Sequence, residues 1–258
     1  MREHAFRLGA LLAVAVALAA CGEGDGGPAG GSDGGAPEPS IQIPPVDGPY
    51  DWTVEATDFV SSVDNPYFPL VPGTTLVYRG QSEGEREVVT IEVTREMKEI
   101  LGVTCVVVKD TVEIAGKIHE LTFDWYAQDV DGNVWYMGED SKEYEDGKVS
   151  STEGSWEAGV DGALPGVIMP ANPEVSLAYT QEHYAGEAED KGKVVALDRT
   201  VSVPYGSFDE VLVTEDWTPL EPRFLEHKHY APGIGVVFEE LVKGGDGAIR
   251  LVEVRRPV

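Results

Sequence analysis

The chain has 258 residues and carries 46 acidic side chains against 19 lysines and arginines, which gives a net charge of −27. Such an acidic excess argues against nucleic-acid binding and against direct adsorption to anionic lipid surfaces. Apolar residues form 42% of the chain, which is enough for a substantial core.

The first twenty residues have the features of a secretory signal. Arg2 and Arg7 flank the start of an apolar run of 13 residues at 8–20, which is shorter than the roughly 20 residues that cross a bilayer. The run ends in Leu18, Ala19 and Ala20, directly before Cys21. This ending resembles a bacterial lipoprotein signal. We therefore predict a signal peptide over 1–20 and a lipid anchor, of the palmitate type, on Cys21; the alternative is an ordinary signal peptide with an accidental cysteine.

The anchor predicts a location in the cell envelope, outside the cytoplasm, on the outer membrane or on the outer face of the cytoplasmic membrane. Residues 22–35 contain eight glycines in fourteen positions, and four prolines follow by Pro45. A segment of this composition has little to bury and favours a flexible tether. We assign the tether to 21–48 and a single β domain to 49–258.

Hydrophobic residues in the domain alternate with the period of a β-strand. Residues 85–96 place Val89, Ile91 and Val93 on one face, 104–112 are almost continuously apolar to Val108, and 117–128 alternate again. Further strands are predicted near 74–79, 134–138, 177–184, 193–203, 208–217, 224–230, 234–242 and 248–255, with a short helical turn within 56–63. Glycine-containing turns separate these runs at hairpin spacing. The fold class is mainly β: an antiparallel curved sheet, either a half-barrel or a two-layer β-sandwich built of hairpins, with very little helix.

One segment, 154–175, lacks this pattern of alternating strands and turns. It contains Pro165, Pro170 and Pro173, and proline is excluded from central strands. We therefore expect a long irregular connection, which could cover an opening of the sheet.

Several long motifs resemble a family of exported bacterial proteins, many of them lipoproteins. The motifs are NPYFPLVPGTTLVYRG (65–80), DWYAQDVDGNVWYMGEDSKEYEDGK (124–148), SWEAGVDGALPGVIMPANP (155–173), VPYGSFDEVLVTEDWTPLEP (203–222) and EHKHYAPGIGVV (226–237). The resemblance implies export and brings no substrate, cofactor or catalytic residue. Members of the family often have tyrosine where this chain has His229, so the resemblance gives that histidine no shared role.

The hairpin tip at 129–133 is a candidate calcium site. Asp129, Asp131 and Asn133 offer alternating side-chain oxygens, and Gly132 permits a sharp turn. Three ligands are too few for calcium, so a site here would be weak and would need an acid from elsewhere. The alternative is a plain hairpin turn, because Asp, Asn and Gly are common turn residues.

A second candidate metal pair lies at 226–229. In a strand, His227 and His229 share one face, as two metal ligands can, but zinc needs three or four protein ligands. The alternative is a solvent-facing strand whose other face, with Glu226, Lys228 and Tyr230, pairs with the acids of 186–190.

Three functions remain open. The first is a lipid-anchored binding or accessory protein with an apolar cavity for a small apolar ligand. The second is an envelope scaffold that contacts a partner protein through an exposed aromatic hairpin of Trp125, Tyr126, Trp135 and Tyr136. The third is a hydrolase with a carboxylate pair, such as Asp124 and Glu139 facing one another across a hairpin.

No nucleophile motif is present, and Cys105 lies in a Val-rich strand where a thiol is inert. We therefore expect no enzymatic activity, and no cofactor apart from weak calcium.

Overall fold

The computed structural model describes residues 41–50, 55–82 and 84–257. The predicted signal peptide, Cys21 and most of the predicted tether lie outside this range. The described strands are β1 (Phe59–Val60), β2 (Thr75–Ser82), β3 (Glu85–Ile100), β4 (Val103–Ile114), β5 (Lys117–Asp129), β6 (Val134–Glu145), β7 (Lys148–Ser151), β8 (Trp156–Glu157), β9 (Leu164–Met169), β10 (Ala178–Thr180), β11 (Glu182–His183), β12 (Lys191–Val203), β13 (Gly206–Trp217), β14 (Leu225–Ala231), β15 (Gly235–Lys243) and β16 (Ala248–Arg255). A short 3-10 turn, η1 (Ala56–Asp58), precedes them.

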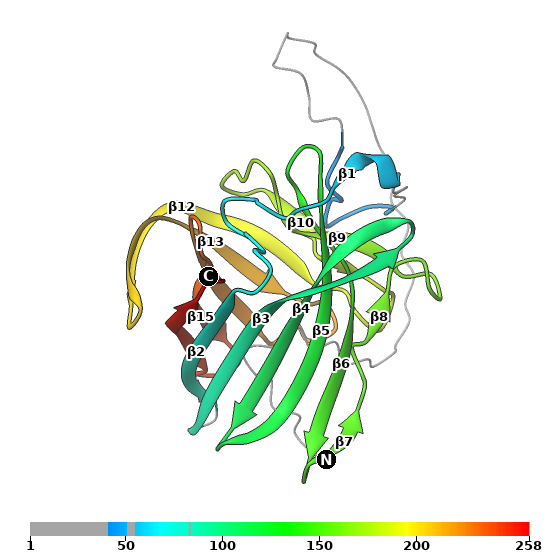
Figure 1. Ribbon diagram of the computed structural model, residues 1–258. Helices are drawn as coiled ribbons and strands as arrows, with labels where there is room; N and C mark the ends of the chain where they lie inside the picture. The colour runs from blue at the N-terminus through cyan, green and yellow to red at the C-terminus, as the bar shows by residue number, and fades with distance from the viewer. Residues whose placement is uncertain (1–40, 51–54, 83, 258) are drawn as a thin grey trace.

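The strands form one antiparallel, strongly curved sheet. Their order is β10-β12-β13-β14-β15-β16-β2-β3-β4-β5-β6-β9-β11, and β1, β7 and β8 pair at its margins with β5 or β6. In Figure 1 the sheet curls so that β2 to β6 lie in front of β12, β13 and β15. The mainly β, hairpin-built fold that the sequence predicts is confirmed, as is the short helical turn within 56–63.

The segment 178–183 joins the two ends of this strand order. Its first part, β10, pairs with β12, while β11, one residue further on, pairs with β9. Gln181 lies between the two, and glycines let the backbones approach it. A Cβ on Gly166 would lie 2.1 Å from the Gln181 carbonyl oxygen, and one on Gly192 would lie 2.6 Å from its side-chain nitrogen. The sheet is therefore barrel-like, and alternate residues of each strand face its interior.

The expectation of a long irregular connection at 154–175 is wrong for 156–157 and 164–169, which are strands. The segment contains β8 and β9, and β9 pairs with both β6 and β11. Proline is tolerated because Pro165 is the second residue of β9, next to the short strand β11, where one missing N–H interrupts little of the ladder. This segment is part of the wall of the barrel.

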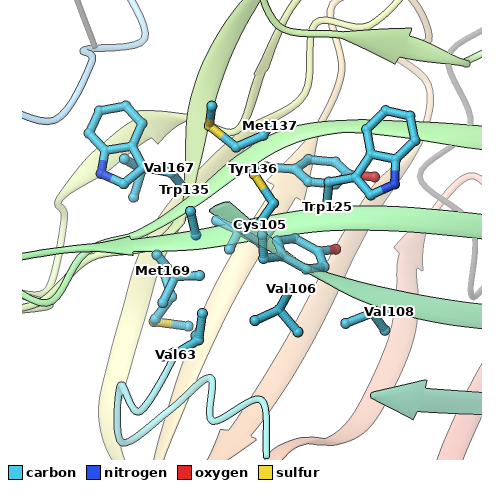
Figure 2. Packing of buried hydrophobic residues seen from close by; sticks show 14 of the residues in the cluster. Val63, Cys105, Val106, Val108, Trp125, Trp135, Tyr136, Met137, Val167 and Met169 are labelled. Carbon is cyan, nitrogen blue, oxygen red and sulfur yellow. The ribbon is translucent and has the colours of Figure 1, made fainter. Parts of the chain in front are cut away.

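The aromatic hairpin is packed into the core, which contradicts the exposed contact surface that the scaffold alternative requires. Trp125 is 8% exposed, Tyr126 is 6% exposed, and Trp135 and Tyr136 are fully buried. Figure 2 shows Trp125, Trp135 and Tyr136 with Cys105, Met137, Val106 and Val108. The four large rings lie toward the tip of the β5–β6 hairpin, and burying them there stabilises the fold.

Cys105 lies at the centre of the same cluster. Its side chain is fully buried, and burial raises the pKa of its thiol to about 12. The prediction of an inert, buried thiol in a Val-rich strand is confirmed in its burial, and the raised pKa disfavours the reactive thiolate.

Candidate functional site: a buried acidic chamber

The interior of the barrel contains a group of ionisable side chains that we call the acidic chamber. Nine carboxyls surround one lysine, and their charges act on one another. The members are Asp110, Glu120, Asp124, Glu139, Glu182, Asp190, Asp216, Glu226, Glu239 and Lys228. Charged residues are rarely buried without partners, so this group requires an explanation beyond packing.

Two facing walls of the barrel supply these side chains. On one wall, Asp124 of β5 lies directly opposite Glu139 of β6, and Asp110 of β4 lies opposite Thr122. On the other wall, Lys228 of β14 lies between Thr214 of β13 and Glu239 of β15. Directly opposed residues of antiparallel strands share a face. The predicted carboxylate pair Asp124 and Glu139 is therefore confirmed as cross-strand neighbours.

The inward face of β5 is the polar one. Thr122, Asp124 and Tyr126 are buried, whereas Leu121 and Phe123 are only half-buried. A carboxyl oxygen of Asp124 accepts a hydrogen bond of 2.6 Å from the Tyr136 hydroxyl. The barrel therefore encloses polar groups in its middle rather than a continuous apolar lining.

A cavity of about 140 Å³ lies within the chamber. Its charged lining consists of five carboxyls, those of Asp110, Glu120, Asp124, Glu139 and Glu239, together with Lys228. The remaining wall is largely aromatic or aliphatic: Phe68, Leu70, Leu76, Tyr78, Ile91, Val108, Tyr126, Ile168, Tyr230, Ile234 and Val236. The predicted cavity is therefore present, but it is smaller than the few hundred cubic ångströms expected, and its lining is both apolar and acidic.

Burial raises the pKa of several of these carboxyls. It raises the pKa of Asp124 to about 6 and that of Asp190 to about 7, although the nearby Lys228 ammonium lowers both. Burial also raises the pKa of Glu139 well above its ordinary value, and the neighbouring Glu182 and Asp124 raise it further. Desolvation disfavours a charged carboxylate, so burial favours the protonated form of each of these acids.

Lys228 is the lysine of the chamber, and it is held at one wall. Its Nζ lies 3.3 Å from Asp216 Oδ2 and 4.0 Å from Glu226 Oε2. The charges of Asp216 and Glu239 are the main reasons that its pKa is raised despite burial. The ion pairs of Lys228 are with Asp216 and Glu226. Toward the acids of 186–190, its effect is electrostatic: its charge lowers the pKa of Asp190.

Carboxyl oxygens of the chamber remain without a hydrogen-bond partner among the described residues. They include Asp110 Oδ1 and Glu139 Oε1, which belong to cavity-lining residues, and both oxygens of Glu182. The Trp156 indole lies near enough to Glu182 to lower its pKa. Buried polar atoms in folded proteins are nearly always paired. The unpartnered oxygens therefore identify the chamber as a place where a donor is missing.

The mouth of the cavity lies beside the segment that precedes β2. Pro69, Leu76 and Ile234 line both the cavity and an outer hollow of about 400 Å³, whose rim includes Arg256. The Gly233 N–H donates to the Pro66 carbonyl at 2.8 Å and fastens this segment to the β14–β15 turn. The expected cover, residues 154–175, contributes only Ile168 to the cavity lining. That segment is not the cover, because its strand β9 is fixed in the wall.

The hairpin tip with the calcium candidates is a closed hydrogen-bond network. Asp129 Oδ1 accepts from the backbone N–H of Asp131 and Asn133, and its Oδ2 accepts from Asn133 Nδ2 and Trp135 Nε1. Asn133 Oδ1 accepts from the Ala171 N–H, and Asp131 Oδ2 accepts from the Ile41 N–H. Since N–H donors occupy the proposed ligand oxygens, the geometry favours the hairpin alternative. Calcium binding stays a prediction to be tested.

His227 and His229 are neighbours on the outer face of β14. Their ring centroids are 6.5 Å apart, and each Nε2 is near a different acid: Glu215 at 3.7 Å and Glu240 at 3.6 Å. Across residues 41–50, 55–82 and 84–257, no three His, Cys, Asp or Glu side chains are placed to hold a metal ion. A metal role for the two histidines stays a prediction.

Sequence reasoning missed most of the chamber, although part of its signal is visible. The period-two series Glu120, Thr122, Asp124 and the series Glu226, Lys228, Tyr230 are polar faces of strands that are otherwise apolar. Asp110, Glu182 and Asp216 belong to different hairpins, and only the closure of the sheet brings them to the same interior.

Comparison with known proteins gives little further information. No protein-family model and no curated protein matches the chain. One similar crystal structure is that of a protein from Bacteroides fragilis, provisionally described as exported and as having a YmcC-like fold. The two chains are 19% identical, with a TM-score of 0.41, and the match covers 74% of this chain and 99% of that one. A protein from Parabacteroides distasonis, provisionally described as a lipoprotein, has 12% identity and a TM-score of 0.41 over the same shares. At these scores the likeness says nothing about the function of this chain.

Within the described part of the chain, no helix is both long enough and apolar enough to cross a membrane.

Proposed function

We propose that this protein is an exported binding protein that keeps a small ligand in its acidic chamber and is held at a membrane by a lipid on Cys21. The observation that carries the binding role is the cavity of about 140 Å³, whose lining includes carboxyls with unpartnered oxygens. Leaving a buried acceptor unpaired costs about 1–3 kcal/mol. A ligand that donates hydrogen bonds to these oxygens would recover this free energy, which supports a binding role for the chamber.

The location rests on the sequence. The apolar run before Cys21 has the length of a signal peptide, and the Gly-rich stretch behind it suits a tether. Cys21→Ser should release the protein from the membrane fraction. A Cys21→Ser protein that stays in the membrane pellet after a high-salt wash would contradict the anchor.

A carboxylate-dependent hydrolase is the second candidate function. It is favoured by the cross-strand pair of Asp124 and Glu139, because burial raises the pKa of both carboxyls. Paired carboxyls with raised pKa values can serve acid–base catalysis. The small volume of the cavity, about 140 Å³, argues for the binding role instead, because a hydrolase must admit a substrate, a water and a leaving group.

The binding role is tested by filling the cavity. Val108 lies opposite Asp124 and lines the cavity, so Val108→Phe should block it. Val88→Phe makes the same change at a half-buried position of β3 that does not line the cavity. Native mass spectrometry of protein purified from the producing cell should show a bound small molecule in the wild type and in Val88→Phe, and none in Val108→Phe.

Two outcomes would overturn the binding role. One is a wild-type protein without any bound small molecule. The other is a bound molecule that Val108→Phe retains. Turnover of a bound ester or glycoside that is lost in both Asp124→Asn and Glu139→Gln would instead support the hydrolase.

A further inference from the structure

The two walls of the acidic chamber differ in the cations available to them. Lys228 forms its ion pair on the β13–β14 wall, where its Nζ lies 3.3 Å from Asp216 Oδ2. The opposite wall carries Asp110, Asp124 and Glu139, and the charged lining of the cavity contains no second lysine and no arginine. Glu139 is only 3% exposed, and its Oε1 has no hydrogen-bond partner in the described residues. This wall therefore offers buried acceptors and lacks a cation.

The apolar part of the cavity limits what can carry that cation. Phe68, Leu70, Ile168 and Ile234 form a hydrophobic side next to the carboxyls. The volume of about 140 Å³ is close to that of a cavity known to hold benzene, so the ligand has roughly six to eight non-hydrogen atoms. A ligand of this size can place a charged end at Glu139 and a short hydrocarbon stem against the apolar side.

Other classes of ligand fit less well. A metal ion needs several converging ligands, and the described residues contain no group of three or more that could hold one. An anion would meet five lining carboxyls and a single lysine. A neutral apolar molecule would leave Glu139 Oε1 and Asp110 Oδ1 unpaired, and a quaternary ammonium has no N–H to donate to them.

We propose that the ligand of the acidic chamber is a small primary amine, bound as its ammonium, whose N–H groups bond the carboxyls of Glu139 and Asp110 and whose short apolar stem lies against Phe68, Leu70 and Ile234. The inference rests on the proposed binding function and specifies its ligand class. Charge-assisted hydrogen bonds of this kind are about twice as strong as neutral ones.

Binding of an ammonium is coupled to loss of a proton from the chamber. The groups that act on Glu139 are Asp124 and Glu120 of β5, Glu182 of β11 and the Tyr136 hydroxyl. Those acting on Asp110 are Asp124, Glu120 and Glu239. All of these except the tyrosine raise the pKa of their neighbour and so favour its protonated form. An ammonium favours the ionised carboxylates, so its binding should release a proton.

The test is isothermal titration calorimetry of the full protein with 1-aminopentane, its neutral isostere 1-pentanol and tetramethylammonium. At pH 7, in two buffers of different ionisation enthalpy, 1-aminopentane should bind and release about one proton per molecule. Replacing the charged acceptor in Glu139→Gln should weaken amine binding by about 10- to 100-fold and reduce the proton release. Binding of 1-pentanol should be weaker from the start and unchanged by the substitution. Glu143→Gln, on the same strand but outside the cavity lining, should behave like the wild type.

The outcomes separate the ligand class from the binding function. If 1-pentanol or tetramethylammonium binds as tightly as the amine, and Val108→Phe abolishes that binding, the amine proposal is wrong and the binding function stands. If no probe binds and no small molecule accompanies the purified protein, both are wrong. Amine binding that Glu139→Gln leaves unchanged would place the ammonium elsewhere and overturn the proposal.

Discussion

Two groups of buried acids in this protein have opposite surroundings. At the β5–β6 hairpin tip, the carboxylate of Asp129 accepts four hydrogen bonds from backbone and side-chain N–H groups. Ten residues further along the chain, on the next strand, Glu139 is also buried, yet one of its oxygens has no partner in the described residues. A buried acid with all its donors stabilises the fold, whereas one without them costs free energy and indicates a site.

The largest expected effect of this contrast is at the hairpin tip. Asp129→Ala removes the acceptor of four donors, including the Trp135 indole and Asn133 Nδ2. The free energy of unfolding should fall by roughly 3–5 kcal/mol in urea titrations, because several buried donors lose their partner. Asp131→Ala removes an acceptor at the half-buried edge and should cost less than about 1 kcal/mol. Equal losses for the two variants would show that the network around Asp129 is not what stabilises the hairpin.

The second expected effect is an unusual dependence of stability on pH. In the folded protein the pKa of Asp124 is raised to about 6 and that of Asp190 to about 7, above the ordinary 3.8 of an aspartate. The folded state therefore binds more protons than the unfolded chain. This stabilisation is complete below about pH 4 and is lost as pH rises through 6 and 7.

For Asp124 alone, a shift of about two units corresponds to roughly 3 kcal/mol. Denaturant titrations should show stability falling between about pH 4 and pH 7, with a flatter profile in Asp124→Asn. A free energy of unfolding that rises over that interval in the wild type would refute the neutral, desolvated state of the chamber.

The third prediction makes the same chemical change at both acids. At pH 8, Glu139→Gln should raise the free energy of unfolding by about 1–2 kcal/mol, because it removes an acid whose charged form is desolvated and beside other acids. Asp129→Asn should lower it, because an amide NH₂ would face the donors of Asn133 and Trp135. Thermal unfolding compares the two directly. Destabilisation by both variants would contradict the claim that the charge of Asp129 stabilises the fold while that of Glu139 costs free energy.

The smallest expected effect concerns calcium at the hairpin tip. Thermal unfolding in EDTA and in 10 mM calcium, with magnesium as the control, should differ little for the wild type and for Asp131→Ala, since N–H donors hold the oxygens of Asp129. A bound calcium at ten times its dissociation constant would add about 1.4 kcal/mol. A calcium-specific shift of that size that Asp131→Ala abolishes would restore the metal site.

Most of the strands could be predicted from the sequence, because their signal is local. Alternation at Val89, Ile91 and Val93 and the turn at Ala115-Gly116 depend only on neighbouring residues, and both appear in the structure as predicted. Pro165 misled the prediction of 154–175, since a proline near the end of a strand leaves the rest of the ladder intact.

The chamber could not be predicted in the same way. On β5, the rule that apolar residues face the core would turn Leu121 and Phe123 inward, but the structure buries Thr122 and Asp124 instead. The choice depends on the opposite wall, where Lys228 is available to lower the pKa of Asp124. No pattern in residues 117–129 contains that information, and it arises only when the sheet closes at Gln181.

The central claim is that the chamber lacks a positively charged donor at Glu139. A crystal structure of the protein grown with 1-aminopentane tests it most directly. We predict that the amine occupies the cavity with its nitrogen about 2.8 Å from Glu139 Oε1 and its stem against Phe68 and Ile234. A cavity that stays empty at millimolar amine, or an amine whose nitrogen points away from Glu139 and Asp110, would contradict this account.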